Sequence, residues 1–241
     1  MATPPPEAAE AVEADTDSAT LARFDLNTRL LHWANAVAFA VLAATGAVMF
    51  FPTLSESVGR REVVRISHDV AGYVILLWAV VAVAGTWGRG LRADLRTIDA
   101  RDSADAAWAR GGWRADLFGG PDGDVPPVGK YNPGQKLNSA FTAAAMAILA
   151  GTGTIMFFHT RFPLWLKAGA NLVHDLTALV LVVVVVAHVV LGLRDGGAMR
   201  GMVTGRVRRD WAERHHRGWA RVTSPGPDPD RPNPGDPDSP R

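Results

Sequence analysis

Residues 171–194 read NLVHDLTALVLVVVVVAHVVLGLR, an apolar run that contains two histidines, His174 and His188. A run of this length and hydropathy is long enough to cross a bilayer as one α-helix. The histidines are fourteen positions apart, which in a helix corresponds to a rise of about 21 Å and nearly four whole turns. Both imidazoles therefore leave the same face of the helix at different depths. Because an ionisable side chain inside a membrane is costly and imidazole is a common ligand of haem iron, we expect this helix to hold two cofactors, one above the other.

The rest of the chain contains three more apolar runs. Apolar residues make up 48% of the 241 residues, and most of them gather into runs long enough to span a bilayer. We expect four transmembrane helices, at about 30–51, 70–87, 137–158 and 172–193. The predicted fold is an all-α membrane protein, a four-transmembrane-helix bundle.

The segments outside these runs have a different composition. Glycine and proline clusters interrupt the segment between the second and third runs, so we do not expect it to form one long helix. Both ends of the chain are rich in proline and in acidic or polar residues. We therefore predict disordered tails at 1–22 and 222–241, on either side of a membrane domain at 23–221. The acidic start lacks a basic region followed by an apolar core, so we expect no signal peptide.

Charge and cysteine content exclude several classes of site. The net charge of +1 gives no indication of nucleic-acid binding, and we expect no nucleic-acid partner. The chain has no cysteine, which excludes thiolate-bound iron–sulfur clusters, disulfides and the covalent attachment of c-type haem. Any haem in this chain is therefore bound non-covalently, by histidine or methionine.

The distribution of basic residues predicts the orientation in the membrane. Twenty of the 25 lysines and arginines lie in the two ends of the chain and in the segment between the second and third runs. Basic residues are enriched on the cytoplasmic side of membrane proteins. We expect a multi-pass protein of the bacterial inner membrane with both termini in the cytoplasm.

This topology sorts four histidines into two pairs of equal depth. His68 opens the second span and His174 opens the fourth, so both are expected near the periplasmic face. His32 begins the first span and His188 lies near the end of the fourth, so both are expected near the cytoplasmic face. Two axial imidazoles on one haem require two helices that face each other at one depth. We predict that the bundle encloses two b-type haems, with His68 and His174 as iron ligands on the periplasmic side and His32 and His188 on the cytoplasmic side.

The other histidines and the nearby arginines have simpler interpretations. A lone histidine near the end of a span is more often an interfacial or hydrogen-bonded residue than a ligand. His159 has no partner at its depth, and we expect no metal at His215 and His216. Three arginines, Arg29, Arg65 and Arg194, lie close to predicted ligands. They are either partners of the haem propionates or residues that mark the membrane ends.

Four segments resemble one known family. They are RLLHWANAVAF at 29–39, FFPTL at 50–54, VGKYNPGQKLN at 128–138 and GGAMRGMVTGRVRRDWAERHHRGW at 196–219. Over residues 23–221 the chain is similar to the cytochrome b (gamma) subunit of membrane-bound, respiratory formate dehydrogenase. The resemblance implies haem ligands at His32, His68, His174 and His188, in the pairing given above.

The resemblance also implies a quinone site beside the cytoplasmic haem. Its residues match Asn132, Gly134 and Gln135, together with the surroundings of His188. Amide groups donate hydrogen bonds to a quinone carbonyl, and glycine permits close approach of the backbone. The alternative interpretation of YNPGQK is a turn that leads into a helix. The chain departs from the family at Pro133, where a small residue is usual, and at the HHRGW segment.

The function expected from these observations is electron transfer. The resemblance implies that the chain accepts electrons from an iron–sulfur (beta) subunit, itself supplied by a catalytic (alpha) subunit that oxidises formate, and reduces menaquinone or ubiquinone on the cytoplasmic side. We expect no catalytic residue for formate oxidation in this chain. Two alternatives remain open: the cytochrome b subunit of a hydrogenase or a thiosulfate/polysulfide reductase, and a non-redox four-helix membrane protein.

Overall fold

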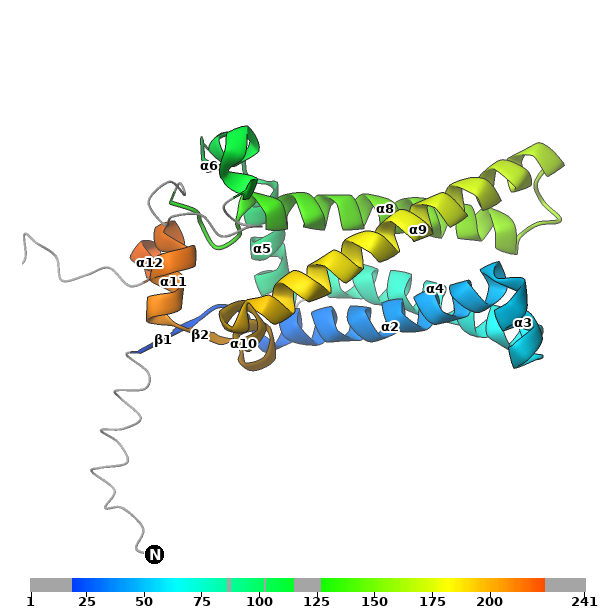
Figure 1. Cartoon of the computed structure of the whole chain (residues 1–241), viewed down its shortest axis with the longest axis horizontal. Coiled ribbons are helices and arrows are strands. Elements are labelled where there is room, and N and C mark those ends of the chain that lie inside the picture. The colour runs from blue at the N-terminus through cyan, green and yellow to red at the C-terminus, as the bar shows by residue number, and fades with distance from the viewer. Residues whose placement is uncertain (1–18, 86–87, 102, 115–126, 224–241) are drawn as a thin grey trace, which may run out of the picture. The chain divides into compact units, whose positions relative to one another are not determined.

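The computed structural model describes residues 19–85, 88–101, 103–114 and 127–223, which divide into two compact units (Figure 1). The larger unit consists of Ala22–Arg101 and Gly134–Arg206. The smaller unit consists of Met1–Leu21, Asp102–Pro133 and Val207–Arg241, as far as these segments are described.

Four long helices form most of the larger unit. They are α2 (Leu26–Phe50), α4 (Arg61–Ala84), α8 (Pro133–Phe157) and α9 (Leu164–Arg194). All four are long and apolar enough to cross a membrane, and Figure 1 shows α9 running obliquely to the other three. The predicted all-α bundle of four transmembrane helices is confirmed.

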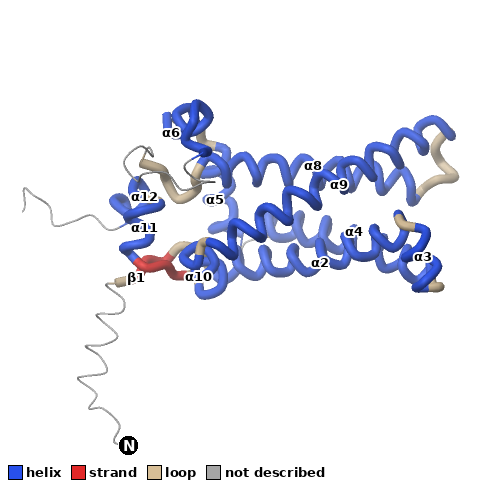
Figure 2. The backbone as a smooth tube through the Cα atoms, in the orientation of Figure 1, coloured by secondary structure: helices blue, strands red, loops and turns tan. Residues whose placement is uncertain are grey.

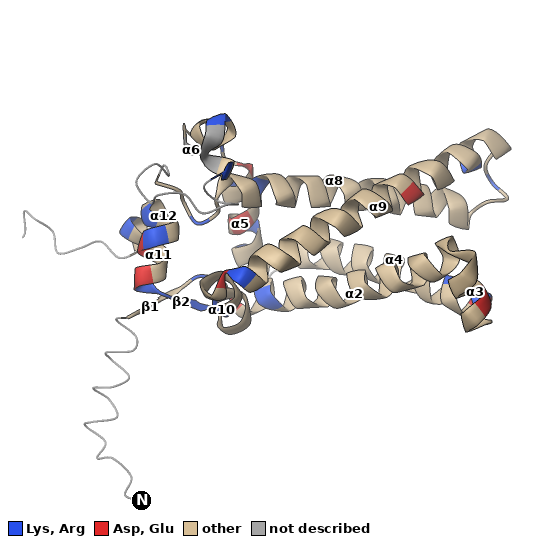
Figure 3. Cartoon of the chain, in the orientation of Figure 1, with Lys and Arg blue, Asp and Glu red and all other residues tan. Residues whose placement is uncertain are grey.

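The surfaces of these helices suit a lipid environment. In α9 the buried residues are Ala170 and Leu181, whereas Leu179 and Val183 are more than half exposed. Figure 3 shows the long helices almost free of charged residues except near their ends. Exposed apolar side chains along a whole helix are stable in hydrocarbon, where the backbone satisfies its own hydrogen bonds.

Each helix begins several residues before its predicted span. The second span was expected from residue 70, but α4 begins at Arg61, and the fourth was expected from residue 172, but α9 begins at Leu164. The additional turns are polar or interfacial in sequence, so hydropathy alone does not reveal them. At the start of α2 the carboxylate of Asp25 accepts a hydrogen bond from the Thr28 backbone N–H at 2.7 Å, which caps the helix.

Short helices connect and terminate the long ones. Pro52 begins α3 (Pro52–Val58), and α10 (Gly196–Thr204) ends at Gly205, whose φ of 83° favours glycine. Helix α5 (Arg89–Asp99) contacts α2 and α4. Arg92 donates to the carbonyl oxygens of Val83 at 2.7 Å and Gly85 at 2.9 Å, so its guanidinium satisfies the end of α4.

The smaller unit consists of short elements, and its buried apolar residues include Val128, Val207 and Ala212. It contains α6 (Ser103–Ala107), the π-helical turn η2 (Trp108–Gly112), α11 (Arg209–His215) and α12 (Arg217–Thr223). The expectation that the segment after the second span is not one long helix is confirmed, because α5 ends at Asp99, whereas α6 begins at Ser103 and continues directly into η2. Figure 2 shows the two short strands, β1 (Thr20–Ala22) and β2 (Arg206–Arg208), which pair with each other.

The strand pairing corrects one predicted boundary. Residues 1–22 were expected to form a disordered tail, but β1 lies within that range and Leu21 is only 5% exposed. A residue whose strand pairs with β2 and whose apolar side chain is buried belongs to the folded part of the chain. Likewise, α12 extends to Thr223, just beyond the predicted limit of 221. The remainder of both predicted tails, 1–18 and 224–241, lies outside the described residues.

Candidate functional site

Four histidines of the larger unit form two pairs. The ring centroids of His32 on α2 and His188 on α9 are 6.1 Å apart, with an angle of 58° between the rings. The centroids of His68 on α4 and His174 on α9 are 6.2 Å apart, with an angle of 61°. The structure therefore brings together the two pairs that membrane depth predicts, and α9 contributes one histidine to each.

The separation within each pair leaves room for a metal ion between the rings. An imidazole nitrogen binds a first-row transition metal at about 2 Å, so two imidazoles on opposite sides of one ion have centroids about 6.3 Å apart. The observed separations of 6.1 and 6.2 Å agree with this value. Each pair would therefore suit a haem iron held by one histidine from each of two helices.

The His68–His174 pair has hydroxyl partners on neighbouring helices. Thr45 Oγ1 on α2 lies 2.9 Å from His68 Nδ1, and Thr152 Oγ1 on α8 lies 2.9 Å from His174 Nδ1. A bond at Nδ1 leaves Nε2 available as the metal-binding nitrogen.

A glycine follows each of these threonines. Cβ atoms built at Gly46 and Gly153 would lie 3.6 and 3.4 Å from Cε1 of His68 and His174 respectively, so each ring lies close to the backbone.

The sequence contains a signal for these threonines that the histidine pattern did not reveal. Residues 44–51 read ATGAVMFF and residues 151–158 read GTGTIMFF, and each segment precedes a His-Asp pair by a similar distance. The structure explains this repeat, because both copies place Thr-Gly beside a histidine of the next long helix. Comparing the two halves of the chain would have found it.

The His32–His188 pair has different surroundings. Trp33 packs edge-on against His32, with centroids 5.4 Å apart. Within the part of the chain that the structure describes, neither ring of this pair has a hydrogen-bond partner. The two pairs therefore offer different electronic environments to a metal.

The three arginines predicted near the pairs occupy different settings. Arg29 donates from Nε to the Met202 carbonyl at 3.3 Å and from Nη2 to the Val203 carbonyl, both in the last turn of α10. Arg65 forms an ion pair with Asp69 at 3.1 Å. Arg194 is the last residue of α9 and is exposed. A role with haem propionates remains a prediction for all three.

The predicted quinone residues lie at the start of α8. Asn132 directly precedes the helix, Pro133 is its first residue, and Gly134 and Gln135 lie in its first turn. Proline is favoured at this position because its fixed φ suits a helix and its missing N–H would have no partner there. The departure at Pro133 is thus compatible with helix initiation. Lys136 donates to the Ala100 carbonyl at 2.9 Å, which holds the first turn of α8 against the end of α5.

The remaining histidines have structural partners. His159 is exposed, and its Nδ1 lies 3.3 Å from the Phe157 carbonyl. In the smaller unit, His215 stacks on Trp211 at 5.2 Å, and His216 is only 3% exposed, with Nδ1 2.8 Å from the Gly129 carbonyl. His216 therefore belongs to a folded core, although its surroundings in sequence are polar.

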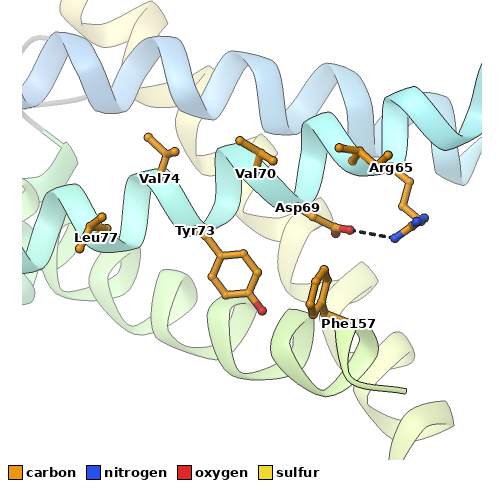
Figure 4. Close-up of a pocket in the computed structure, with 8 residues that line it drawn as sticks. Arg65, Asp69, Val70, Tyr73, Val74, Leu77 and Phe157 are labelled. Carbon is orange, nitrogen blue, oxygen red and sulfur yellow. Dashed lines mark hydrogen bonds and ion pairs between the residues drawn. The ribbon is translucent and has the colours of Figure 1, made fainter. Parts of the chain in front are cut away.

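A separate apolar pocket of about 620 Å³ lies along α4 (Figure 4). Its lining residues are Arg65, Ile66, Asp69, Val70, Tyr73, Val74 and Leu77 of α4 and Phe157 of α8. Tyr73 meets Phe157 edge to face, with centroids 5.6 Å apart. None of the four paired histidines lines this pocket, so it is distinct from the site that they form.

The chain matches a known protein family over most of its length. The prokaryotic cytochrome b561 family matches residues 23–205. The cytochrome b556(Fdn) subunit of the nitrate-inducible formate dehydrogenase of Escherichia coli (strain K12) is 28% identical over 199 residues, which cover 80% of this chain and 87% of that subunit. The formate dehydrogenase cytochrome b556 subunit of Haemophilus influenzae is also 28% identical over 199 residues, which cover 80% of this chain and 79% of that subunit. The family match includes all four long helices and both histidine pairs.

Proposed function

The chain belongs to the prokaryotic cytochrome b561 family, and on that basis we propose that it is the di-haem cytochrome b subunit of a formate dehydrogenase. It is a multi-pass membrane protein with an electron-transfer role. In the proposal it carries electrons from an iron–sulfur partner on the periplasmic side to menaquinone or ubiquinone on the cytoplasmic side. The observation that carries the proposal is the pair of ring separations, 6.1 and 6.2 Å, each of which suits one iron between two imidazoles.

The four paired histidines are the proposed iron ligands. His32 and His188 hold one haem b, and His68 and His174 hold the other. A bound haem b supplies one-electron chemistry at its iron. Because α9 carries one ligand of each pair, its rise of about 21 Å between them fixes the two sites at different depths. Arg29, Arg65 and Arg194 lie close to these ligands in sequence, and we propose them as partners of the propionates.

The proposed quinone residues are those at the start of α8. The side-chain amides of Asn132 and Gln135 can donate hydrogen bonds to a quinone carbonyl, and Gly134 lets the backbone approach closely. The proposal places quinone beside His188, on the side of the membrane where protons are taken from the cytoplasm. Reduction of a quinone to a quinol consumes two electrons and two protons.

The orientation is supported by charge. The ends of the chain and the segment between α4 and α8 carry twenty of its 25 lysines and arginines, as the positive-inside rule requires of cytoplasmic segments. Both termini and the His32–His188 pair are therefore proposed to lie on the cytoplasmic side of the inner membrane. Electrons would then move inward across the membrane while protons are consumed inside.

The proposed partners are the subunits that would supply electrons to this chain. It has no cysteine, so the iron–sulfur clusters that would supply electrons belong to another subunit. The two relatives described above are named as formate dehydrogenase subunits. We propose that a catalytic (alpha) and an iron–sulfur (beta) subunit of a formate dehydrogenase assemble with this chain.

The test uses the complex purified through a tag on this chain from its native membrane. We expect formate to reduce the b-type cytochrome and an added quinone to reoxidise it. The His68→Ala variant should lose formate-dependent reduction, whereas His159→Ala should retain it, because His159 is exposed and lies outside both pairs. A cytochrome that hydrogen reduces and formate does not would contradict the formate assignment and favour a hydrogenase. Oxidation of the reduced cytochrome by thiosulfate or polysulfide would favour the corresponding reductase.

A further inference from the structure

Thr45 and Thr152 occupy equivalent positions beside the His68–His174 pair. Each threonine is on the long helix that precedes its histidine in the chain, Thr45 on α2 and Thr152 on α8. Each Oγ1 lies 2.9 Å from Nδ1 of the histidine. The same contact at both ligands of one pair is an arrangement that a chance packing contact would not repeat.

The hydroxyl protons decide the direction of these two hydrogen bonds. Thr45 Oγ1 lies 2.7 Å from the Val41 carbonyl, and Thr152 Oγ1 lies 2.7 Å from the Ile148 carbonyl. A carbonyl oxygen can only accept, and a threonine hydroxyl has one proton. Each hydroxyl therefore donates to its own helix and accepts from the histidine, so Nδ1 of the histidine carries the proton.

A protonated Nδ1 has two consequences for a metal ligand. It leaves the lone pair on Nε2, the nitrogen that faces away from the threonine, and it fixes the orientation of the ring. It also raises the basicity of the ligand, because a hydrogen bond from Nδ1–H to an acceptor gives the imidazole more anionic character. A more basic axial ligand stabilises the ferric over the ferrous state and so lowers the reduction potential.

The His32–His188 pair lacks this arrangement among the residues that the structure describes, where neither ring has a hydrogen-bond partner. The chain thus repeats Thr-Gly at 45–46 and 152–153 for one pair only. The difference between the pairs is built into the sequence of the long helices.

We propose that Thr45 and Thr152 are positioning residues for the haem held by His68 and His174. Their hydroxyls select the Nδ1-protonated tautomer of both ligands, orient Nε2 toward the iron and lower the reduction potential of this haem relative to that of the haem held by His32 and His188. The inference rests on the proposed function, because it requires these histidines to be iron ligands.

The variants separate the hydrogen bond from the packing of the side chain. Thr45→Val and Thr152→Val keep the shape of the side chain and remove the acceptor, whereas Thr45→Ser and Thr152→Ser restore it. Thr154→Val is the matched control, because Thr154 lies on α8 and donates to the Ala150 carbonyl at 2.7 Å, as Thr152 does to Ile148, and its hydroxyl does not meet a histidine ring.

The measurement is a spectroscopic redox titration of the purified complex, with haem content per chain and the electron paramagnetic resonance spectrum of the oxidised protein. We expect both valine variants to shift one midpoint potential upward and to change the resonance of the same haem. The other potential should stay unchanged, the serine variants should restore the first, and Thr154→Val should match the wild type. The haem concerned is identified as the one that His68→Ala removes.

Two results would overturn the inference. One is unchanged potentials and resonances in both valine variants that retain two haems. The other is a loss of haem in the valine variants that serine does not restore, which would make the threonines packing residues only. A loss that serine restores, with the wild-type potential, supports the inference. Absence of haem from the wild type, or two haems in His68→Ala, would instead refute the ligand assignment itself.

Discussion

Arg29 ties the start of α2 to the last turn of α10, and its removal should loosen α10 by a measurable amount. Its guanidinium donates to the carbonyl oxygens of Met202 and Val203. These carbonyls lie in the last turn of a helix, where the backbone offers them no N–H donor. A hydrogen bond from a charged donor contributes about 1.5–3 kcal/mol. Because Arg29 is partly exposed, we expect Arg29→Ala to cost about 2 kcal/mol in total for the two bonds.

This cost predicts the rate at which α10 opens. Amide exchange by local opening follows the free energy of that opening, and 1.4 kcal/mol corresponds to a factor of ten. A loss of about 2 kcal/mol therefore predicts exchange about 30-fold faster in the last turn of α10. The assay is hydrogen–deuterium exchange of the purified protein in detergent, read by mass spectrometry on peptides that cover α10.

A matched variant and a second readout separate the two interpretations of Arg29. Arg200→Ala removes an exposed guanidinium from α10 itself and should leave exchange in its last turn close to that of the wild type. Unchanged exchange in Arg29→Ala would refute the reasoning from the two carbonyl contacts. If a haem potential shifted in that variant while α10 stayed protected, Arg29 would be a propionate partner instead.

Three further predictions concern other parts of the chain. His174→Ala and His188→Ala should each reduce the haem content from two per chain to one, and the spectrum of the remaining haem should differ between the two variants. His159→Ala should keep two haems. A haemochrome assay checks this, and loss of both haems from either single variant would contradict independent sites. Asp195 caps α10 by accepting hydrogen bonds from the backbone N–H groups of Gly197 and Ala198 at 3.0 and 3.1 Å. Asp195→Ala should therefore destabilise α10 by about 1 kcal/mol. Amide exchange in α10 equal to that of the wild type would argue against the cap. Hydrogen bonds from Arg208 lower the pKa of Asp210 from 3.8 to about 2. The stability that this carboxylate gives to the smaller unit is therefore complete above pH 4 and is lost as the pH falls toward 2. Asp210→Asn should remove that acid dependence from the amide exchange of α11, and an unchanged pH profile of exchange would refute the prediction.

Hydropathy was sufficient to predict the four long helices, but it could not predict where they begin. The central turns must be apolar in lipid, so the sequence there permits little else. The first turns of α4, from Arg61 to Asp69, are rich in charged residues and lie outside any apolar window. Within these turns Arg65 forms ion pairs with Glu62 and Asp69 at helical spacing, and hydropathy does not measure such contacts.

The site was predictable to the extent that it depends on depth. The positions of His32, His68, His174 and His188 along their spans determine which of them can face each other, and the structure pairs them in that way. The hydroxyl partners were not predicted, because a threonine in a span is common and becomes informative only when its neighbour is known. The environment of His216 was missed for a similar reason, since its burial depends on the distant segment that contains Gly129.

The central claim is that the two histidine pairs hold two haems, and a haem count of the purified chain tests it most directly. The measurement is a pyridine haemochrome assay with a reduced-minus-oxidised visible spectrum, on protein whose helical content confirms that it is folded. The account predicts two haems b per chain, with low-spin spectra typical of two axial histidines. A folded chain that carries no haem would contradict the account, and one that carries a single haem would refute one of the two pairs.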